Sequence, residues 1–329
     1  MDWNKREVLI TGAGGFIGSH LTEKLVSEGA SVRAFVRYNS RGDPGLLRQL
    51  TAKTLSQVKI YAGDLRDPQV IEQAVAGCQI VFHLGALISI PYSYHNPYAV
   101  AETNILGTLN VLMACRKEKV ERLIHTSTSE VYGTAQQVPI SEAHPLQGQS
   151  PYSASKIGAD KLAESFFCAY ELPVVTVRPF NTYGPRQSAR AVIPAIITQA
   201  LVQQKIRIGN LETTRDFTYV TDTVAGFIKA SEVGGVEGKT FNLGTGREIR
   251  IGDLAQLIIQ KINPSIELEI DPIRLRPKKS EVFRLISDNS LARATLGWQP
   301  EIDFEKGLEQ TIDWIQDHLD LYHIGNYEL

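Results

Sequence analysis

The stretch EVLITGAGGFIGSHLTEKLVSEG, residues 7–29, decides the fold, because it joins an apolar strand to an amphipathic helix through a glycine-rich turn. We expect the strand over residues 7–11 and the helix over residues 19–29, where Gly29 marks the end. Apolar residues recur at helical spacing along one face of this helix, namely Leu21, Leu25 and Val26. A strand, a tight turn and a helix in this order begin a βαβ unit.

The same alternation continues through the first half of the chain. Short β-branched runs separated by segments of helical period follow at residues 31–36, 58–62, 80–85, 121–127 and 172–178. This pattern predicts an α/β fold, a Rossmann-type doubly wound parallel sheet, with a smaller C-terminal substrate-binding region. We expect residues 1–178 to form the dinucleotide-binding domain and residues 179–329 to form mainly the second region, with about 216–245 returning to the first.

The glycine turn has the spacing of a phosphate-binding site. Gly12 permits a tight turn, Gly15 lets the backbone approach a pyrophosphate, and Gly18 lets helix and strand pack closely. The N-terminus of the following helix offers free N–H groups to an anion, and Phe16 and Ile17 in the turn are also expected to bind the cofactor. The alternative is a tight turn without a ligand, but the strand, turn and helix context favours a dinucleotide.

The next two strand ends bear on which dinucleotide binds. The second strand is followed by Arg37 and by no carboxylate, which favours the 2′-phosphate of NADP over the free ribose hydroxyls of NAD. Arg37 as a solvated edge residue is the alternative. Asp64, after the third strand, is placed to meet the adenine or to cap a helix before Pro68.

Tyr152 and Lys156 stand four residues apart and share one face of a predicted helix. An ammonium near a phenol favours the phenolate and so lowers the phenol's pKa, which makes the tyrosine a candidate base. The pair lies downstream of STSEVYG, residues 127–133, at the carboxyl end of a predicted strand, where ligands bind in an open α/β sheet.

Composition narrows the possible partners and compartment. The chain holds 34 Lys and Arg against 36 Asp and Glu, a formal net charge of −2, which argues against nucleic acid as a partner. No apolar run approaches the ~20 residues of a membrane span, and the N-terminus resembles no signal peptide. Three distant cysteines without a CxxC pair indicate reduced thiols, so we expect a cytoplasmic protein.

Many ordered segments together resemble the extended short-chain dehydrogenase/reductase family, in its nucleotide-sugar epimerase and dehydratase branch. They are TGAGGFIG, AGDLRD, HLGA (83–86), NILGT (104–108), STSEVYG, YSASK, RPFNTYGPR (178–186), RDFTYVTD (215–222), FNLGTG (241–246) and the tail from LGWQPEIDF. The resemblance spans nearly the whole chain. It implies NAD or NADP as cofactor, and adds Leu65, Gly85 and Ala86 to the cofactor-binding residues.

The resemblance also implies catalytic roles. Tyr152 would remove a proton from a sugar hydroxyl, Lys156 would tune it, and Thr128 would orient the sugar. Glu130 would be the base that removes the C5 proton once C4 is a ketone, a step that epimerases do not need. Its alternatives are binding a sugar hydroxyl or capping the next turn. Ser129 stands where many dTDP-glucose dehydratases carry an acidic Asp, so the acid for the departing oxygen is Ser129, a water or Glu130.

The sequence therefore predicts a UDP-N-acetylglucosamine 4,6-dehydratase, similar to those of nonulosonic sugar synthesis. The Thr-Ser-Glu triplet also resembles GDP-mannose dehydratases and nucleotide-uronate decarboxylases. The alternatives are thus a UDP-uronate decarboxylase, a nucleotide-sugar epimerase, or a dinucleotide-binding regulatory protein without turnover.

Substrate contacts, assembly and metal binding complete the predictions. Family positions near the substrate diphosphate match Asn181, Arg215 and Arg276, and Arg186 lies in the GPR turn; Arg274 competes with Arg276. The resemblance implies a homodimer through helices at 98–116 and 152–170. His83 and His125 are expected in the core. We predict no metal site, because His318 and His323 are five apart and share no helix face.

Overall fold

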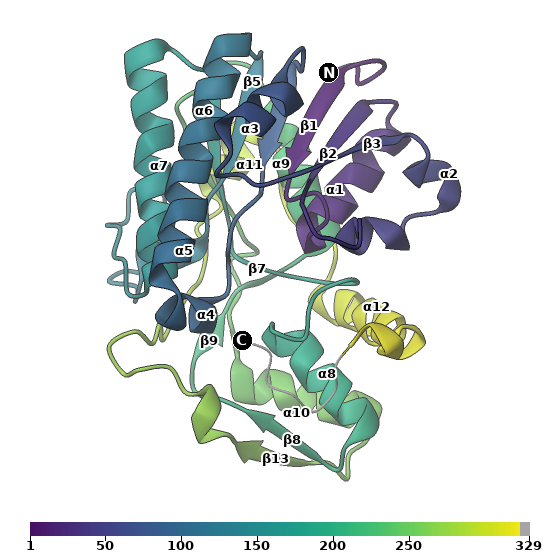
Figure 1. Ribbon diagram of the computed structural model, residues 1–329. Helices are drawn as coiled ribbons and strands as arrows, with labels where there is room; N and C mark the ends of the chain where they lie inside the picture. Colours follow the sequence, from purple (N-terminus) through teal and green to yellow (C-terminus); the bar gives the residue numbers. More distant parts are fainter. Residues whose placement is uncertain (323–329) are drawn as a thin grey trace.

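The computed structural model describes residues 1–322 and is built around a seven-stranded parallel sheet (Figure 1). His323 and the rest of 323–329 lie outside the described residues. The strand order is β11-β6-β5-β4-β1-β2-β3. The bounds are β1 Glu7–Thr11, β2 Ser31–Arg37, β3 Val58–Gly63, β4 Ile80–His83, β5 Arg122–Thr126, β6 Val174–Pro179 and β11 Thr240–Leu243. The Rossmann-type sheet predicted from the sequence is confirmed.

The strand order reverses between β1 and β4. From β1 the chain proceeds outward to β2 and β3, and then returns to β4 and proceeds to β5 and β6 on the other side. Loops that follow two such neighbouring strands leave in opposite directions and open a crevice at the carboxyl edge. The glycine turn follows β1 and Gly85 follows β4, so both lie at this crevice.

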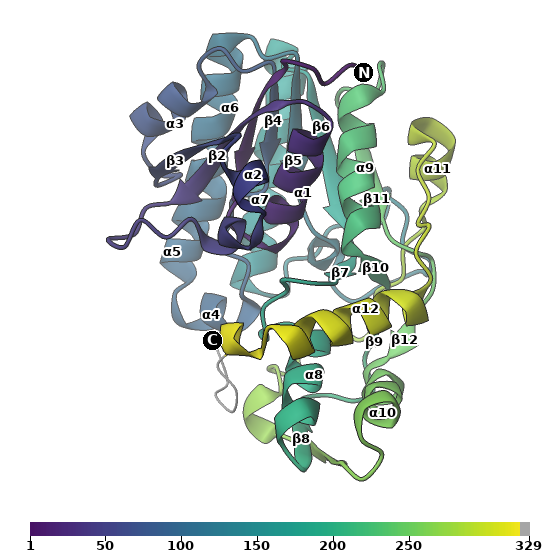
Figure 2. The ribbon, with the colours of Figure 1, turned by 90° about the vertical axis from the view of Figure 1, so that its right-hand side faces the viewer.

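Helices cover both faces of the sheet (Figures 1 and 2). One face carries α1 Phe16–Ser27 and α9 Val220–Glu232, which contact each other. The other face carries α3 Pro68–Val75, α6 Gly107–Glu118 and α7 Pro151–Tyr170. Helix α1 begins three residues before the expected position 19, because Gly15 is the extended residue that caps it, at φ −85° and ψ 179°.

Short elements connect these helices to the sheet. They are η1 Gly45–Gln49, α2 Ala52–Leu55, α4 Ile90–His95, α5 Pro97–Ala101, the π-helical η2 Glu102–Leu106 and η3 Ser129–Tyr132. The predicted helix at 98–116 is thus interrupted by η2 before α6 begins. His83 and His125 are buried in β4 and β5, as expected for core histidines.

The C-terminal region lies below the carboxyl edge of the sheet (Figure 1). Its helices are α8 Val192–Val202, α10 Ile251–Ile262 and α12 Phe304–Asp317, with α11 Ser290–Leu296 beside α9 and β11. Its strand pairs are β7 Asn181–Tyr183 with β10 Phe217–Tyr219, β9 Thr214–Arg215 with β12 Ile249–Arg250, and β8 Lys205–Ile208 with β13 Glu267–Ile270. Two short 3-10 helices are η4 Pro272–Arg274 and η5 Leu319–Leu321.

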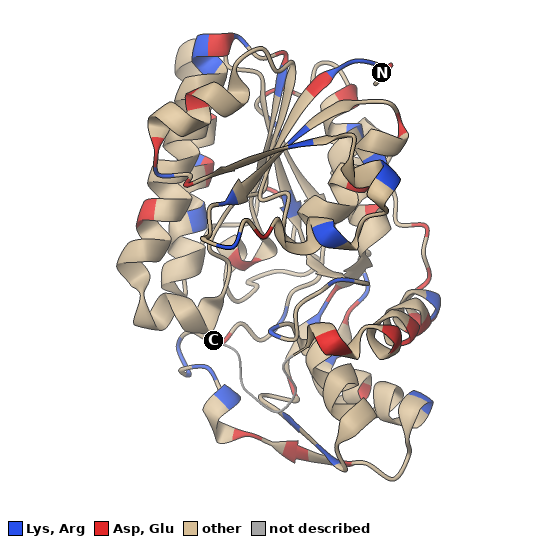
Figure 3. Ribbon diagram, turned by 45° about the vertical axis from the view of Figure 1, so that its right-hand side comes forward, with Lys and Arg blue, Asp and Glu red and all other residues tan. Residues whose placement is uncertain are grey.

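One apolar core joins the sheet to this C-terminal region. The same cluster of buried side chains holds Val8 and Phe82 of the sheet and Ile196, Ile258 and Ile315 of α8, α10 and α12. The two regions are therefore packed together rather than linked by a flexible hinge. Acidic and basic residues are interspersed along the helices (Figure 3). Within residues 1–322, every helix is too short or too polar to cross a bilayer.

Candidate active site

The start of α7 fixes the position of Tyr152. Ser150 caps the helix, since its hydroxyl accepts a hydrogen bond from the Ser153 backbone N–H at 3.1 Å and the Ser153 hydroxyl accepts one from the Ser150 N–H at 3.0 Å. Pro151 occupies the first helical position. Tyr152 therefore lies in the first turn and Lys156 one turn later, and both side chains are buried.

Lys156 is held against β5. Its Nζ donates a hydrogen bond to the Thr126 carbonyl at 2.6 Å. Burial lowers the pKa of this ammonium to about 8, although the Asp160 carboxylate acts in the opposite direction. Lys156 thus titrates near the working pH of an enzyme.

Tyr152 lies beside Thr128, at the carboxyl end of β5. Burial raises the pKa of the phenol, and a hydrogen bond with the Thr128 side chain partly offsets this. Thr128 is also the N-cap of η3, and its hydroxyl accepts a hydrogen bond from the Glu130 N–H at 3.3 Å. The phenol can therefore act as a base only where a nearby cation favours the phenolate.

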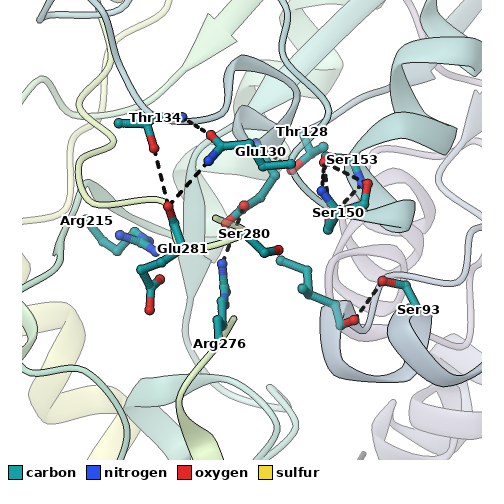
Figure 4. A network of polar contacts seen from close by, with 12 residues as sticks. Ser93, Thr128, Glu130, Thr134, Ser150, Ser153, Arg215, Arg276, Ser280 and Glu281 are labelled. Carbon is teal, nitrogen blue, oxygen red and sulfur yellow. Dashed lines mark hydrogen bonds and ion pairs between the residues drawn. The ribbon is translucent and has the colours of Figure 1, made fainter. Parts of the chain in front are cut away.

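Glu130 faces the C-terminal region and forms an ion pair with Arg276 at 3.7 Å (Figure 4). It also lies close enough to Tyr152 that its charge raises the pKa of the phenol. The N-cap of η3 is Thr128 and not Glu130. A carboxylate thus lies between the phenol and the arginine-bearing segment.

A cavity of about 270 Å³ opens beside this carboxylate, between α8 and the segment after β13. Its lining includes Asn181, Arg215, Arg274, Arg276 and Glu281. In the part of the chain that the structure describes, Asn181 Oδ1 and Arg276 Nη1 are buried without a hydrogen-bond partner. Burial lowers the pKa of the Arg215 guanidinium, and the Glu130 carboxylate opposes this shift. Buried cations and an orphaned amide oxygen suit a ligand with anionic groups and hydroxyls.

The segment that carries Arg276 is fastened to the first region. The Gln149 side-chain amide donates to the Lys279 carbonyl at 3.0 Å, and the Thr134 hydroxyl donates to the Glu281 carbonyl at 3.3 Å. Tyr94 and Ser280 are joined through their hydroxyls at 2.6 Å. Thr134, Ser280 and Glu281 of this network are shown in Figure 4, and Glu281 also lines the cavity.

Arg186 lies outside this cavity. Its Nη2 forms an ion pair with Glu23 of α1 at 2.7 Å, and it is absent from the lining of the cavity. The neighbouring Pro185 carbonyl is 2.9 Å from His20 Nε2, also on α1. The GPR turn therefore contacts the helix that follows the glycine turn, while Asn181, Arg215 and Arg276 share the cavity.

The glycine turn forms a close-packed cradle at the crevice. Gly12 has φ +70°, and a Cβ there would lie 2.8 Å from the Gly85 nitrogen. A Cβ on Gly85 would in turn meet Leu65 Cδ1 at 2.8 Å. Gly15 caps α1 and has no side chain, so no capping side chain occupies the backbone N–H groups at Phe16 and Ile17. These residues fit a dinucleotide pyrophosphate.

Two further predicted cofactor residues lie at the ends of β2 and β3. Arg37 is the exposed last residue of β2 and is paired in register with Gly63. Asp64 follows Gly63 and forms an ion pair with Arg66 at 2.6 Å, which lowers the pKa of the Asp64 carboxyl. Ala86, in the loop after β4, is partly buried.

Known proteins resemble this chain over almost its full length. The sequence profile of the GDP-mannose 4,6 dehydratase family matches residues 9–311. The chain belongs to the nucleotide-sugar epimerase and dehydratase branch of the short-chain dehydrogenases/reductases. It is 31% identical to a UDP-glucose 4-epimerase of Mycolicibacterium smegmatis over 94% of this chain and 98% of that protein. It is 30% identical to the dTDP-D-glucose 4,6-dehydratase of Homo sapiens over 95% of this chain and 91% of that protein.

A solved structure also resembles this chain over almost its full length. The dTDP-glucose 4,6-dehydratase DesIV of Streptomyces venezuelae, solved with NAD bound, has a TM-score of 0.87 and 27% identity over 96% of this chain and 99% of that one. The chain is therefore an enzyme of the nucleotide-sugar epimerase and dehydratase family. Lys156, one turn after Tyr152, contacts the carboxyl end of β5, and β5 is the neighbour of β4 in the sheet.

Sequence reasoning missed several polar residues behind the site. Asp160, Tyr132 and Arg178 are buried, and Arg178 donates hydrogen bonds to both of the others. Glu281 lines the cavity. A larger cavity of about 540 Å³ lies behind α7, against Asp160 and Arg178, and neither Tyr152 nor Glu130 lines it. A charged residue within the β-branched run VVTVR, and an Asp one turn after Lys156, were the available signals.

Proposed function

We propose that this enzyme is a nucleotide-sugar 4,6-dehydratase, a hydro-lyase, with UDP-N-acetylglucosamine as its substrate. The observation that carries the proposal is the carboxylate of Glu130, which lies close enough to Tyr152 to raise the pKa of the phenol and forms an ion pair with Arg276 at 3.7 Å. Exchange of configuration at C4 needs a proton acceptor for one hydroxyl, whereas elimination across C5 and C6 needs a second base. The Glu130 carboxylate near the phenol would supply that second base.

The chain's own residues account for the proton transfers. Tyr152 accepts the C4 hydroxyl proton, Lys156 stabilises the phenolate, and Thr128 orients the sugar. A nicotinamide dinucleotide in the glycine cradle would supply the oxidation at C4 and the reduction at C6. Glu130 removes the C5 proton, the C6–O bond breaks, and the oxygen leaves as water with a proton from Glu130 or Ser129.

The cavity would hold the nucleoside diphosphate. Arg215 and Arg276 bring two positive charges to it, and Asn181 offers an orphaned amide. The diphosphate would replace Glu130 as the partner of Arg276, which frees the carboxylate for the sugar. Binding of the substrate diphosphate would thus also free the Glu130 carboxylate from Arg276, so that it can act as the base.

Incubation with UDP-N-acetylglucosamine in deuterium oxide tests the reaction. We expect water release and one solvent deuterium at C5 of a 4-keto-6-deoxy product, seen by mass spectrometry and NMR. Inversion at C4 without loss of water would identify an epimerase instead, and carbon dioxide release from a UDP-uronate would identify a decarboxylase. Absence of cofactor reduction with UDP-, GDP- and dTDP-sugars would favour a binding protein without turnover.

Glu130→Gln separates the two chemical stages. The variant keeps the size of the side chain but cannot accept a proton. We expect it to reduce its cofactor on mixing with substrate and then to stall before elimination. Normal turnover would remove Glu130 as the base.

We propose NADP rather than NAD as the preferred cofactor, because Arg37 ends β2 with an exposed guanidinium. Arg37→Ala should weaken NADP binding by about tenfold and leave NAD binding unchanged, as measured by titration calorimetry. Equal loss for both dinucleotides would refute the preference.

We also propose a homodimer, working in the cytoplasm. Large apolar side chains are exposed along α5, η2 and α6, with Tyr98 75%, Leu106 49% and Met113 50% exposed. A second copy would cover such a surface. The substitution Leu106→Glu should yield monomers in light scattering; an unchanged mass would place the interface elsewhere.

A further inference from the structure

A buried carboxylate lies one turn beyond Lys156 on α7. Asp160 accepts hydrogen bonds at both oxygens, from His125 Nε2 at 3.0 Å and from the Ser127 hydroxyl at 2.7 Å. It also accepts from Arg178 of β6, at 3.0 Å from Nη2 and 3.3 Å from Nε. The carboxylate thus fastens α7 to β5 and β6.

The Arg178 guanidinium extends this hydrogen-bond network to η3. Its Nη1 donates to the Tyr132 hydroxyl at 2.9 Å, and that hydroxyl donates to Asn242 Oδ1 at 2.7 Å. The Asn242 amide nitrogen then donates to the Ile140 carbonyl at 3.0 Å. One guanidinium therefore contacts both the helix that carries Tyr152 and Lys156 and the turn that carries Ser129 and Glu130.

We propose that Arg178, through Asp160 on one side and Tyr132 on the other, is a positioning residue that holds the elimination base in register with the oxidation pair. The inference deepens the proposed dehydratase function and rests on it. The two stages of a dehydration use residues from different elements, α7 for oxidation at C4 and η3 for deprotonation at C5. The substrate must meet both without leaving the site.

Stability alone does not explain such a network. A buried ion pair contributes little to folding compared with apolar residues of the same volume, because both charges lose their hydration. Arg178, Asp160 and Tyr132 are all nearly inaccessible to solvent. What the network supplies is a fixed direction and distance between two elements, and a misplacement of about 1 Å in a reacting group can cost roughly a hundredfold in rate.

Tyr132→Phe breaks the bridge with the loss of one oxygen. The ring remains in its pocket, with the Arg178 guanidinium 5.0 Å from its centroid, but the directional hydrogen bond from Arg178 to η3 is lost. Tyr183→Phe is the matched control, because Tyr183 is equally buried and its hydroxyl donates to the Phe304 carbonyl at 3.0 Å, away from η3. A comparison of the two variants removes the general effect of losing a buried hydroxyl.

The first measurement follows the reaction of the full chain loaded with cofactor. Rapid mixing with UDP-N-acetylglucosamine follows the absorbance of the reduced dinucleotide, which reports C4 oxidation, and quenched samples report deuterium at C5. We expect Tyr132→Phe to slow C5 exchange roughly tenfold or more, with less than about threefold change in oxidation, so that reduced cofactor accumulates. Tyr183→Phe should keep the ratio of the two rates.

Amide hydrogen exchange provides the second measurement and needs no substrate. Residues 129–133 should exchange faster in Tyr132→Phe than in Tyr183→Phe. Equal slowing of both chemical stages, or unchanged exchange at 129–133, would overturn the proposal. If Tyr132→Phe does not fold, Arg178→Lys replaces it, since lysine keeps the charge beside Asp160 but cannot reach Tyr132 as well.

The two proposals fail in different ways. If the wild-type enzyme converts no nucleotide sugar, the dehydratase function is wrong, and hydrogen exchange at 129–133 alone decides the role of Arg178. If the wild-type enzyme dehydrates its substrate and both tyrosine variants behave alike, the function stands and the positioning role is wrong.

Discussion

Replacing Gly12 with alanine should damage the fold and the cofactor site together. Gly12 has φ +70°, which costs a residue with a Cβ about 1–2 kcal/mol. The added Cβ would lie 2.8 Å from the nitrogen and 2.9 Å from the Cα of Gly85, closer than side-chain carbons normally approach backbone. Relief of this overlap requires β1 and the loop after β4 to separate, and such overpacking costs about 1–3 kcal/mol.

Gly77 provides the control. Its φ of +73° is almost the same, but within the described chain nothing lies within 4 Å of a Cβ built there. Gly77→Ala therefore has the backbone strain without the overlap. We expect Gly12→Ala to lower the free energy of unfolding by about 1–3 kcal/mol more than Gly77→Ala does, in urea titrations of the two variants.

Cofactor binding gives the second result. Because the crevice between β1 and β4 is where the glycine cradle opens, its widening should reduce the affinity for NAD and NADP in Gly12→Ala and leave Gly77→Ala unchanged. Calorimetric titration measures this. If the two variants lose the same stability and bind the dinucleotide equally well, the close approach of Gly12 and Gly85 has no role in the cradle.

Three further predictions follow from the buried charges. Burial lowers the pKa of Lys156 from 10.5 to about 8, so between these pH values the unfolded chain binds a proton that the folded chain has lost. The free energy of unfolding of the wild type should therefore rise with pH in this window. Urea titrations of Lys156→Met should lack this rise. Asp160 raises the pKa of Lys156, so Asp160→Asn should move the alkaline limb of cofactor reduction to lower pH; an unmoved limb would contradict the coupling. Arg215→Met removes a costly buried charge, so it should leave the unfolding free energy unchanged or higher while UDP affinity falls about tenfold, and unchanged UDP affinity in calorimetry would remove Arg215 from the substrate site.

The sequence predicts the parallel sheet well because its signals are local. Each strand is a short β-branched run bounded by turn residues, and the glycine turn places Gly12 and Gly15 directly after the first of them. The proximity of Tyr152 and Lys156 also follows from helical spacing alone. Helix starts are less accurate, as at Phe16, because an extended glycine can cap a helix without a polar side chain.

The polar network behind the site depends on contacts between distant residues. Arg178 joins Asp160 across 18 positions and Tyr132 across 46, and no spacing rule connects them. The same holds for Arg276, which lines the cavity and forms an ion pair with Glu130, a residue distant in the sequence. Arg186 shows the converse, because a guanidinium close in sequence to Asn181 turns away to bind Glu23.

The shared apolar core has a consequence for how substrate enters. Movement of the C-terminal region away from the sheet would expose side chains such as Ile196 and Phe82 to water. The free-energy cost is about 25 cal/mol for each Å² of apolar surface exposed. In residues 272–281, after β13, the apolar side chains of Ile273 and Leu275 are 77% and 46% exposed, and Lys279, Ser280 and Glu281 are attached by hydrogen bonds. The next residues are held more firmly, since Val282 and Leu285 are buried in an apolar cluster with Val131 and Tyr132. Opening the arginine-lined cavity therefore disturbs the apolar packing least if residues 272–281 move while Val282, Leu285 and the shared core stay packed.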